Sequence, residues 1–384
     1  MSRRVPNPYR PGFNQAPVAL AGRHRITAAI DEVLAIAALD ARTPRPLALT
    51  GPRGVGKTVI LGEAASRAAD TYAWLTAPVE VRPGRPFLPL LADRLLAIRD
   101  LYRQAKPGTR LRVTGATVRA SVLGVGGEIA LTRDDADRSG RPSLEAALAE
   151  ACAAADALEA GVVVTIDELQ LASKPELGEL AATLQEHVPD DWPLVVLLAG
   201  LPSLRGSHQG VTYLERAEWH SIGLLDQADT LDALRVPAAM AERPMDDAAA
   251  ARLAAASGGY PYAIQLMGHH AWRASSGAQE ITTEHASAAI PAAQEELAAG
   301  LYAARWEDSS QREREYLRAL AQLLSLEPRV TGAQVAAALG KPAKAVSWIR
   351  ESLIQKGTIF PEGDSVRFTI PGLGDWLRSG NDPS

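Results

Sequence analysis

One octapeptide constrains what this chain can fold into more than any other stretch. It reads Gly51-Pro52-Arg53-Gly54-Val55-Gly56-Lys57-Thr58 and fits the pattern G-x-x-x-x-G-K-[ST] of phosphate-binding loops. Residues 46–50 before it form an apolar run typical of a short buried strand, and residues 59–69 after it have the pattern of a helix. Because strand, loop and helix in this order are the context that the motif requires, the octapeptide predicts a nucleotide-binding loop.

The residue types of this loop suit the chemistry of a phosphate chain. Glycines let the backbone curl so that several N–H groups point at one place, and the following helix adds its positive end. We expect Lys57 to bridge the β- and γ-phosphate oxygens, and the hydroxyl of Thr58 to bind Mg²⁺. The alternative interpretation is a glycine-rich turn that matches the pattern by chance.

A second motif further along the chain pairs with the first. Residues 162–166 are an aliphatic run that suits a strand buried on both faces of a parallel sheet, and Asp167 and Glu168 follow it directly. Ligands bind where such strands end. We expect Asp167 to hold Mg²⁺ and Glu168 to polarise the attacking water as a general base. In the alternative interpretation, Glu168 is an acidic residue at a helix N-terminus with no chemistry.

Composition limits the classes of protein to consider. A chain of 384 residues suits two to three domains, and its net charge of −5 excludes a globally basic nucleic-acid binder while leaving room for a local basic face. The single cysteine, Cys152, excludes an internal disulfide framework, so we expect a small core residue and a cytoplasmic protein. The apolar runs are too short to span a bilayer, so we expect no membrane partner.

The order of the patterns predicts four parts of the chain. Residues 1–16 are an irregular, proline-rich arm, 17–225 an α/β core, 226–305 a helical lid and 306–384 a separate small domain. Within the core, we expect strands at 71–81 and 191–200, a helix at 87–105, and inserted strands at 110–131 where apolar and polar residues alternate. The basic residues between 94 and 119 are either a solvated face or a nucleic-acid backbone contact.

One arginine in the core has two possible roles. Arg216 falls on a stretch around residues 213–216 that we expect to be helical. An arginine at this place can reach a γ-phosphate in the same or a neighbouring subunit, which predicts a catalytic contribution and a nucleotide-dependent homo-oligomer. A helix-surface arginine without such a role is the alternative.

The C-terminal part has the pattern of a winged helix-turn-helix. We expect helices at 311–324, 332–339 and 342–356, followed by a hairpin over 358–370. Off the apolar face of the third helix lie Lys344, Ser347, Arg350 and Lys356, which predicts that these residues contact double-stranded DNA. Winged helices also serve as protein-docking modules, and that alternative stays open.

With these motifs in place, the chain resembles the AAA+ ATPases of the initiator-like and STAND-related branch, and more closely an actinobacterial group of AAA-family ATP-binding proteins. The resemblance extends from about residue 17 to residue 378, and the matching stretches include the arm at 7–13, the phosphate loop, and the sequences 166–170, 199–202, 258–262 and 368–372. It implies a P-loop NTPase domain with a three-layer parallel sheet, an all-α lid and a C-terminal winged helix. It also implies that Gly22 and Arg23 lie beside the adenine of ATP.

The chain departs from the family pattern at two positions. The end of the fourth strand, where AAA+ proteins usually place a polar sensor residue, reads Leu198-Ala199-Gly200. The lid has Gly259-Tyr260-Pro261 where a sensor arginine usually stands, as in STAND proteins. Both departures weaken γ-phosphate sensing, so we expect turnover that is slow or depends on a partner.

These observations lead to one principal hypothesis and two alternatives. The principal one is an ATP- and Mg²⁺-binding switch with weak ATPase activity, whose lid couples the nucleotide state to DNA binding by the winged helix. The first alternative is a STAND-type signalling scaffold that binds ATP with little hydrolysis and uses the winged helix for protein contacts. A P-loop kinase is the second, and the paired carboxylates, the lid and the winged domain argue against it.

Overall fold

The computed structural model describes residues 5–12, 15–105, 110–114, 117–122, 125–130, 142–202, 204, 214 and 216–380. The chain divides into two compact units. The first unit joins Met1–Arg23, Gly51–Gly56 and Ile222–Ser384, and the second joins His24–Thr50 and Lys57–Ser221.

A five-stranded parallel sheet forms the centre of the second unit. Its strands are β1 (Leu47–Thr50), β2 (Leu75–Glu80), β6 (Val162–Asp167), β7 (Leu194–Gly200) and β8 (Glu218–Ser221), in the spatial order β2-β6-β7-β1-β8. Every residue of β1, β6 and β7 is buried, as expected of inner strands covered on both faces. The edge strand β8 was not predicted, because its short sequence has little apolar character.

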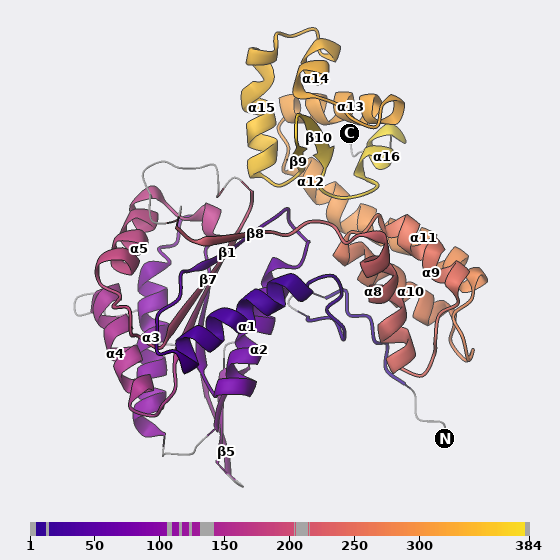
Figure 1. The fold of residues 1–384 in the computed structure, drawn as a ribbon. Helices are drawn as coiled ribbons and strands as arrows, with labels where there is room; N and C mark the ends of the chain where they lie inside the picture. Colours follow the sequence, from indigo (N-terminus) through magenta and orange to yellow (C-terminus); the bar gives the residue numbers. More distant parts are fainter. Residues whose placement is uncertain are drawn as a thin grey trace. The chain divides into compact units, whose positions relative to one another are not determined.

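Helices cover both faces of this sheet, which confirms the predicted three-layer α/β fold (Figure 1). On one face lie α1 (His24–Leu39) and α2 (Lys57–Tyr72), and on the other lie α3 (Leu88–Gln104), α4 (Leu144–Asp156) and α5 (Lys174–Glu186). The side chain of Ser143 caps α4, and Ser173 and Glu176 form a capping box at the start of α5. Cys152 is buried on α4, as predicted for a small core residue.

The strands expected over 110–131 form a separate antiparallel sheet. It consists of β3 (Arg110–Thr114), β4 (Thr117–Val122) and β5 (Val125–Ala130), paired in chain order. The side chains of these strands and the adjoining residues up to 141 lie outside the described part of the chain, so the nucleic-acid interpretation of this segment stays a prediction.

In the first unit, a series of helices follows residue 226, as the sequence pattern predicts. These are α8 (Gln227–Met240), α9 (Asp247–Ser257), α10 (Pro261–Ala274), α11 (Thr283–Leu297), a π-helical turn η2 (Ala298–Tyr302) and α12 (Ala303–Glu307). The N-terminal arm packs on these helices. The amide of Asn7 donates to the carbonyl of His269, and the buried phenol of Tyr9 donates to the carbonyl of Leu234. A side chain at Gly268 would collide with the ring of Tyr9, which explains the glycine.

The C-terminal part of the first unit contains the predicted three helices and hairpin. They are α13 (Gln311–Leu326), α14 (Gly332–Ala338), α15 (Ala343–Gln355) and the antiparallel strands β9 (Ile359–Glu362) and β10 (Ser365–Phe368). Thr331 caps α14, as expected. A last helix, α16 (Leu373–Arg378), was not predicted and packs on α13. That this arrangement works as a winged helix-turn-helix stays a prediction.

Candidate functional site

In the second unit, two residues far apart in sequence meet at the end of β6. Thr58 lies in the first turn of α2, and Asp167 is the last residue of β6. The hydroxyl of Thr58 donates a hydrogen bond to Oδ2 of Asp167, at 2.5 Å. Hydroxyl and carboxylate oxygens are ligands that Mg²⁺ prefers, so the donor set suits this ion. The two residues predicted to bind Mg²⁺ are therefore neighbours in the fold.

Asp167 is buried, and its surroundings act on its charge in opposite directions. Burial raises the pKa of the Asp167 carboxyl, whereas the hydrogen bond from Thr58, the backbone N–H of Glu168 and the nearby ammonium of Lys57 lower it. The net effect is a raised pKa. Since burial is the largest cause, an added cation beside this carboxylate would relieve an unfavourable desolvation. Lys57 is itself 5% exposed at the start of α2.

Glu168 follows Asp167 in an uncommon backbone conformation. Its φ of 54° and ψ of 33° are left-handed, and it precedes the short 3₁₀ helix η1 (Leu169–Leu171). This conformation is energetically unfavourable for residues other than glycine. At Glu168 it turns the chain sharply where the chain leaves β6. Glu168 therefore stands at the N-terminus of a short 3₁₀ helix, and the regular helix α5 starts only at Lys174, after its own cap at Ser173, so the alternative of an N-terminal acid without chemistry stays open.

Gln170 holds the Glu168 carboxylate in place. Its Nε2 donates to Oε2 of Glu168 at 2.6 Å, and its Oε1 accepts from the backbone N–H of Leu201 at 2.9 Å. The carboxamide therefore connects the acidic pair to the end of β7. A side chain at Gly200 would approach Oε1 of Gln170 to 2.9 Å, so the glycine makes room for this amide. Sequence reasoning gave Gln170 no role, because only the fold brings β7 next to η1.

In the first unit, Arg23 ties the phosphate loop to the segment that follows β8. Its guanidinium donates to the carbonyl of Val55 at 3.1 Å and to the carbonyl of Gly223 at 2.8 Å. Burial lowers the pKa of Arg23, and the charge of Asp229 partly offsets this effect. The neighbouring Gly22 has a positive φ of 67° and lies against Asp229, where a Cβ atom would collide. The predicted place of Gly22 and Arg23 beside adenine remains a prediction.

Within the first unit, a tyrosine from the helices after residue 226 contacts the same loop. Tyr260 is 2% exposed, and its hydroxyl donates to the carbonyl of Arg53 at 3.3 Å. A Cβ atom built on Gly54 would lie 1.8 Å from this hydroxyl, and Gly54 has a φ of 76°. Only glycine fits at this position, because it both tolerates the positive φ and leaves room for the phenol. Tyr260 directly precedes the lid helix α10.

The other arginines singled out in the α/β part of the chain differ in their surroundings. Arg216 is exposed in a turn before β8, and the neighbouring residues expected to be helical lie mostly outside the described part of the chain. Arg99 pairs with Asp100 and Glu150. Burial lowers the pKa of Arg94. These two basic residues of the 94–119 segment therefore do not form an open basic face.

The residues predicted to contact DNA differ in how they are held. Lys344 and Ser347 are exposed on α15, and Arg350 is half-buried. The ammonium of Lys356 donates to the carbonyl of Asp308 and lies 2.9 Å from Oε2 of Glu313, whose side chain is only 3% exposed. The charge of Lys356 is therefore paired inside the domain, and DNA contact by any of the four residues stays a prediction.

Histidines and apolar helices add no further functional site in the described residues. His269 accepts from the arm and His270 pairs with Glu296, and no cluster of three or more potential metal ligands from His, Cys, Asp and Glu occurs in the described ranges. Among the described helices, none has the length and apolar character needed to cross a membrane.

Comparisons with known proteins agree with the sheet and the loop. Residues 19–197 match the AAA ATPase domain family, and residues 299–377 match a domain of unknown function, DUF8462. Over 94% of this chain and 96% of its own, the Walker-type ATPase PABY2304 of Pyrococcus abyssi is similar in structure, with 15% identity and a TM-score of 0.60. No match was found among curated proteins.

Two further structures align over most of the chain with lower scores. The RuvB Holliday junction branch migration motor of Thermotoga maritima has 14% identity and a TM-score of 0.46, covering 95% of this chain and 96% of its own. The Orc1 protein of Aeropyrum pernix, solved in complex with DNA, has 16% identity and a TM-score of 0.46, covering 95% and 94%. At 15% identity, the similarity to the Pyrococcus abyssi ATPase concerns the fold alone.

Proposed function

Starting from an AAA+ P-loop ATPase domain over residues 19–197, we propose that this chain is an ATP-binding switch that hydrolyses ATP slowly or on stimulation. In this proposal the lid couples the nucleotide state to double-stranded DNA binding by the C-terminal domain. The observation that carries the nucleotide part is the hydrogen bond between Thr58 and Asp167, with Glu168 directly beside it.

The residues of the second unit have distinct roles in this proposal. Lys57 places a positive charge for the β- and γ-phosphate oxygens, and Thr58 and Asp167 are the ligands for Mg²⁺. Mg²⁺, when bound, neutralises the negative charge that develops on the phosphate oxygens. The loop residues 51–56 precede Lys57 directly in the chain, and the backbone N–H groups of those other than Pro52 supply hydrogen bonds to the phosphates.

Glu168 is the proposed general base, and Gln170 positions it. The carboxylate accepts a proton from the attacking water, and the hydrogen bond from Gln170 restricts where that carboxylate can point. Because Gln170 is also anchored to the N–H of Leu201, a shift at the end of β7 would move the base. This link offers a way for a partner to stimulate hydrolysis.

The lid part of the proposal is supported by the contacts on the phosphate loop within the first unit. Tyr260 and Arg23 both donate to carbonyl groups of that loop, and Tyr260 leads directly into α10. A change in loop conformation on nucleotide binding must therefore break or tighten these two hydrogen bonds. The exposed Arg216 is the proposed finger toward a neighbouring subunit, which a rise of specific activity with protein concentration would support.

The DNA part of the proposal depends on the exposed residues of α15. The deciding experiment measures binding of a labelled DNA duplex to the full chain, with and without Mg-ATP, at two salt concentrations. We expect tighter binding in one nucleotide state and weaker binding at higher salt, because phosphate contacts release counterions. Absence of duplex binding at low salt in both nucleotide states would reject this part.

A STAND-type scaffold with protein-docking function is the second candidate. Trp348 is 50% exposed on α15, and the charge of Lys356 is taken up by Glu313. An exposed tryptophan is typical of protein interfaces, where a large rigid side chain gives contact area at little entropic cost. In the same duplex assay, this candidate predicts no DNA binding, together with ATP binding that persists without measurable turnover.

A further inference from the structure

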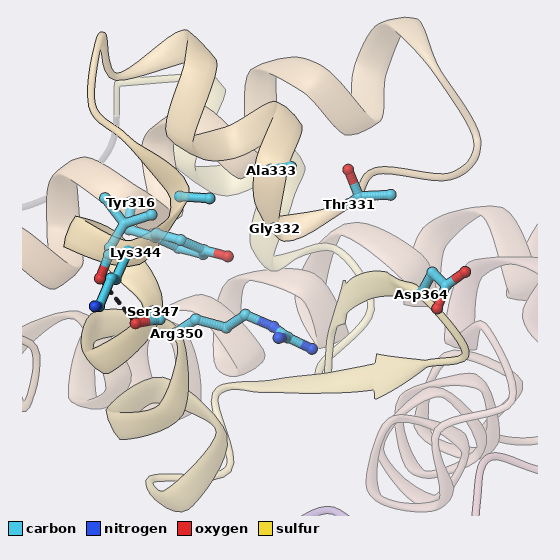
Figure 2. Close-up of a pocket in the computed structure, with 10 residues that line it drawn as sticks. Tyr316, Thr331, Gly332, Ala333, Lys344, Ser347, Arg350 and Asp364 are labelled. Atoms are coloured by element: carbon cyan, nitrogen blue, oxygen red, sulfur yellow. Dashed lines mark hydrogen bonds between the residues drawn. The ribbon is translucent and has the colours of Figure 1, made fainter.

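The C-terminal domain contains a pocket to which the ATPase proposal assigns no ligand (Figure 2). It has a volume of about 580 Å³ and lies where α13, α14, α15 and the hairpin turn meet. Apolar carbon atoms of Ala333, Ala343 and Val346 form part of its wall. At one end lie Lys344 and Ser347, and at the other lie Thr331 and Asp364.

Two buried polar atoms of the pocket lack a hydrogen-bond partner among the residues that the structure describes. One is the hydroxyl of Tyr316, a residue that is 0% exposed, and the other is Nε of Arg350. Figure 2 shows both side chains reaching into the middle of the pocket from different helices. A buried hydroxyl or N–H group without a partner is costly, so two such atoms in one pocket favour a bound group that satisfies them.

The charge of the pocket selects the kind of group. Lys344 and Arg350 carry positive charge, and the carboxylate of Asp364 stands at the opposite end from Lys344. Burial raises the pKa of Tyr316, so at neutral pH its hydroxyl keeps its proton and can donate. Donors on a guanidinium and a phenol, with an ammonium at one end of the pocket, match an oxyanion with several acceptor oxygens, and arginine is well suited to phosphate.

We propose that this pocket binds a phosphate group, held by Arg350 and Tyr316 with Lys344 at its rim. The phosphate belongs either to the backbone of a DNA duplex or to a free phosphate or phosphate ester, whose chemistry at the donors is the same. In the first case the site deepens the proposed DNA binding, and in the second it is an effector site. The pocket does not depend on the ATPase proposal.

The test uses the full chain with Lys57→Ala, so that the nucleotide loop does not contribute phosphate binding. Inorganic phosphate is titrated while the thermal midpoint is recorded, and binding of a short DNA duplex is measured separately. Tyr316→Phe is the informative variant, since it keeps the ring and removes only the hydroxyl. We expect it to weaken phosphate or duplex binding by about tenfold, the effect of one hydrogen bond to a charged group, without lowering the thermal midpoint of the ligand-free chain.

Tyr302→Phe is the matched control. The hydroxyl of Tyr302 donates to the carbonyl of Pro371 at 2.6 Å, so its removal should lower the thermal midpoint and leave phosphate and duplex binding unchanged. Arg350→Lys keeps the charge but loses the planar fork, and we expect it to weaken the same ligand as Tyr316→Phe.

Each outcome of this comparison has a definite meaning. If Tyr316→Phe weakens inorganic phosphate, the site takes free phosphate, and if it weakens only the duplex, the site takes a backbone phosphate. The proposal is overturned if Tyr316→Phe changes neither ligand, or if it destabilises the ligand-free chain as much as Tyr302→Phe does. The ATPase proposal is judged separately, by the Mg-ATP response of the chain with Lys57 intact.

Discussion

The carboxamide of Gln170 donates to Oε2 of Glu168 at 2.6 Å and accepts from the N–H of Leu201 at 2.9 Å. One side chain thus connects the acidic end of β6 to the end of β7, where AAA+ proteins usually carry a polar sensor residue. The amide of Gln170, on η1, fills the space beside Gly200 at the end of β7. A larger residue at position 200 would crowd this amide, because its Cβ atom would lie 2.9 Å from Oε1 of Gln170.

This connection predicts different effects for two substitutions. Glu168→Gln should keep ATP affinity and remove turnover, because the proton acceptor is lost while Asp167 remains. Gln170→Ala should keep ATP affinity and lower kcat by about 10- to 100-fold, since a misplaced base costs rate and not binding. Phosphate release under saturating Mg-ATP measures both, and Gln185→Ala, on the exposed side of α5, is the control. Equal turnover in the wild type and Glu168→Gln would remove Glu168 from the base role.

The buried ammonium of Lys57 predicts a loss of nucleotide binding. Lys57→Ala should abolish the rise in thermal midpoint that Mg-ATP gives the wild type, because the phosphates lose their point charge. Lys174→Ala removes the same charge from an exposed position at the start of α5 and should leave the rise intact. An unchanged Mg-ATP response in Lys57→Ala would contradict the assignment of the loop.

Two glycines, one in the phosphate loop and one in α2, predict opposite effects on stability. Gly54→Ala should destabilise the protein by more than about 1–2 kcal/mol, because alanine resists a positive φ and its Cβ would collide with Tyr260. Gly62→Ala, inside α2 with no atom near its Cβ position, should stabilise by about 0.5–1 kcal/mol. Urea denaturation measures both free energies of unfolding. Tolerance of Gly54→Ala would show that the Tyr260 contact is not made in solution.

The ion pair of Glu313 predicts a stability that depends on pH. Burial raises the pKa of Glu313, but hydrogen bonds from Lys356, Ser352 and Ser310 outweigh it and lower the pKa from 4.5 to about 2. Since the folded pKa is below the unfolded one, the contribution is complete above about pH 4.5 and is lost as the pH falls toward 2. Glu313→Gln should therefore be less stable at neutral pH and lose less than the wild type over this range. Glu315→Gln, whose partner Lys341 is 3.6 Å away and exposed, should follow the wild type.

The ion pair between Lys356 and Glu313 predicts different roles for Lys344 and Lys356, which the sequence alone does not distinguish. Lys344→Ala should reduce the magnitude of the slope of log affinity for duplex DNA against log salt by about one unit. The reason is that an exposed ammonium bound to one phosphate releases about one counterion from the DNA. Lys356→Ala should leave the slope unchanged and instead lower the thermal midpoint, since it leaves the buried carboxylate of Glu313 without its partner. A slope change in Lys356→Ala as large as that in Lys344→Ala would contradict the pairing.

Much of the fold was predictable because its signals are local. Contiguous apolar runs identify the buried strands β1, β6 and β7, and the loop motif identifies the strand, loop and helix around Lys57. Caps at Ser143 and Thr331 mark helix starts within a few residues of chain. The short strand β8 and the helix α16 escaped prediction because neither is long or apolar enough to stand out, and each depends on packing against an element distant in sequence.

By itself, then, the sequence determined which residues are chemically capable of holding a phosphate and a metal ion. The tertiary structure alone decided which polar groups meet. Gln170 forms hydrogen bonds with Glu168 and Leu201, and Tyr260 donates to the carbonyl of Arg53. Lys356 forms an ion pair with Glu313. The reason is physical, because hydrogen bonds act only over a few ångströms, and folding sets those distances between residues that no local pattern connects.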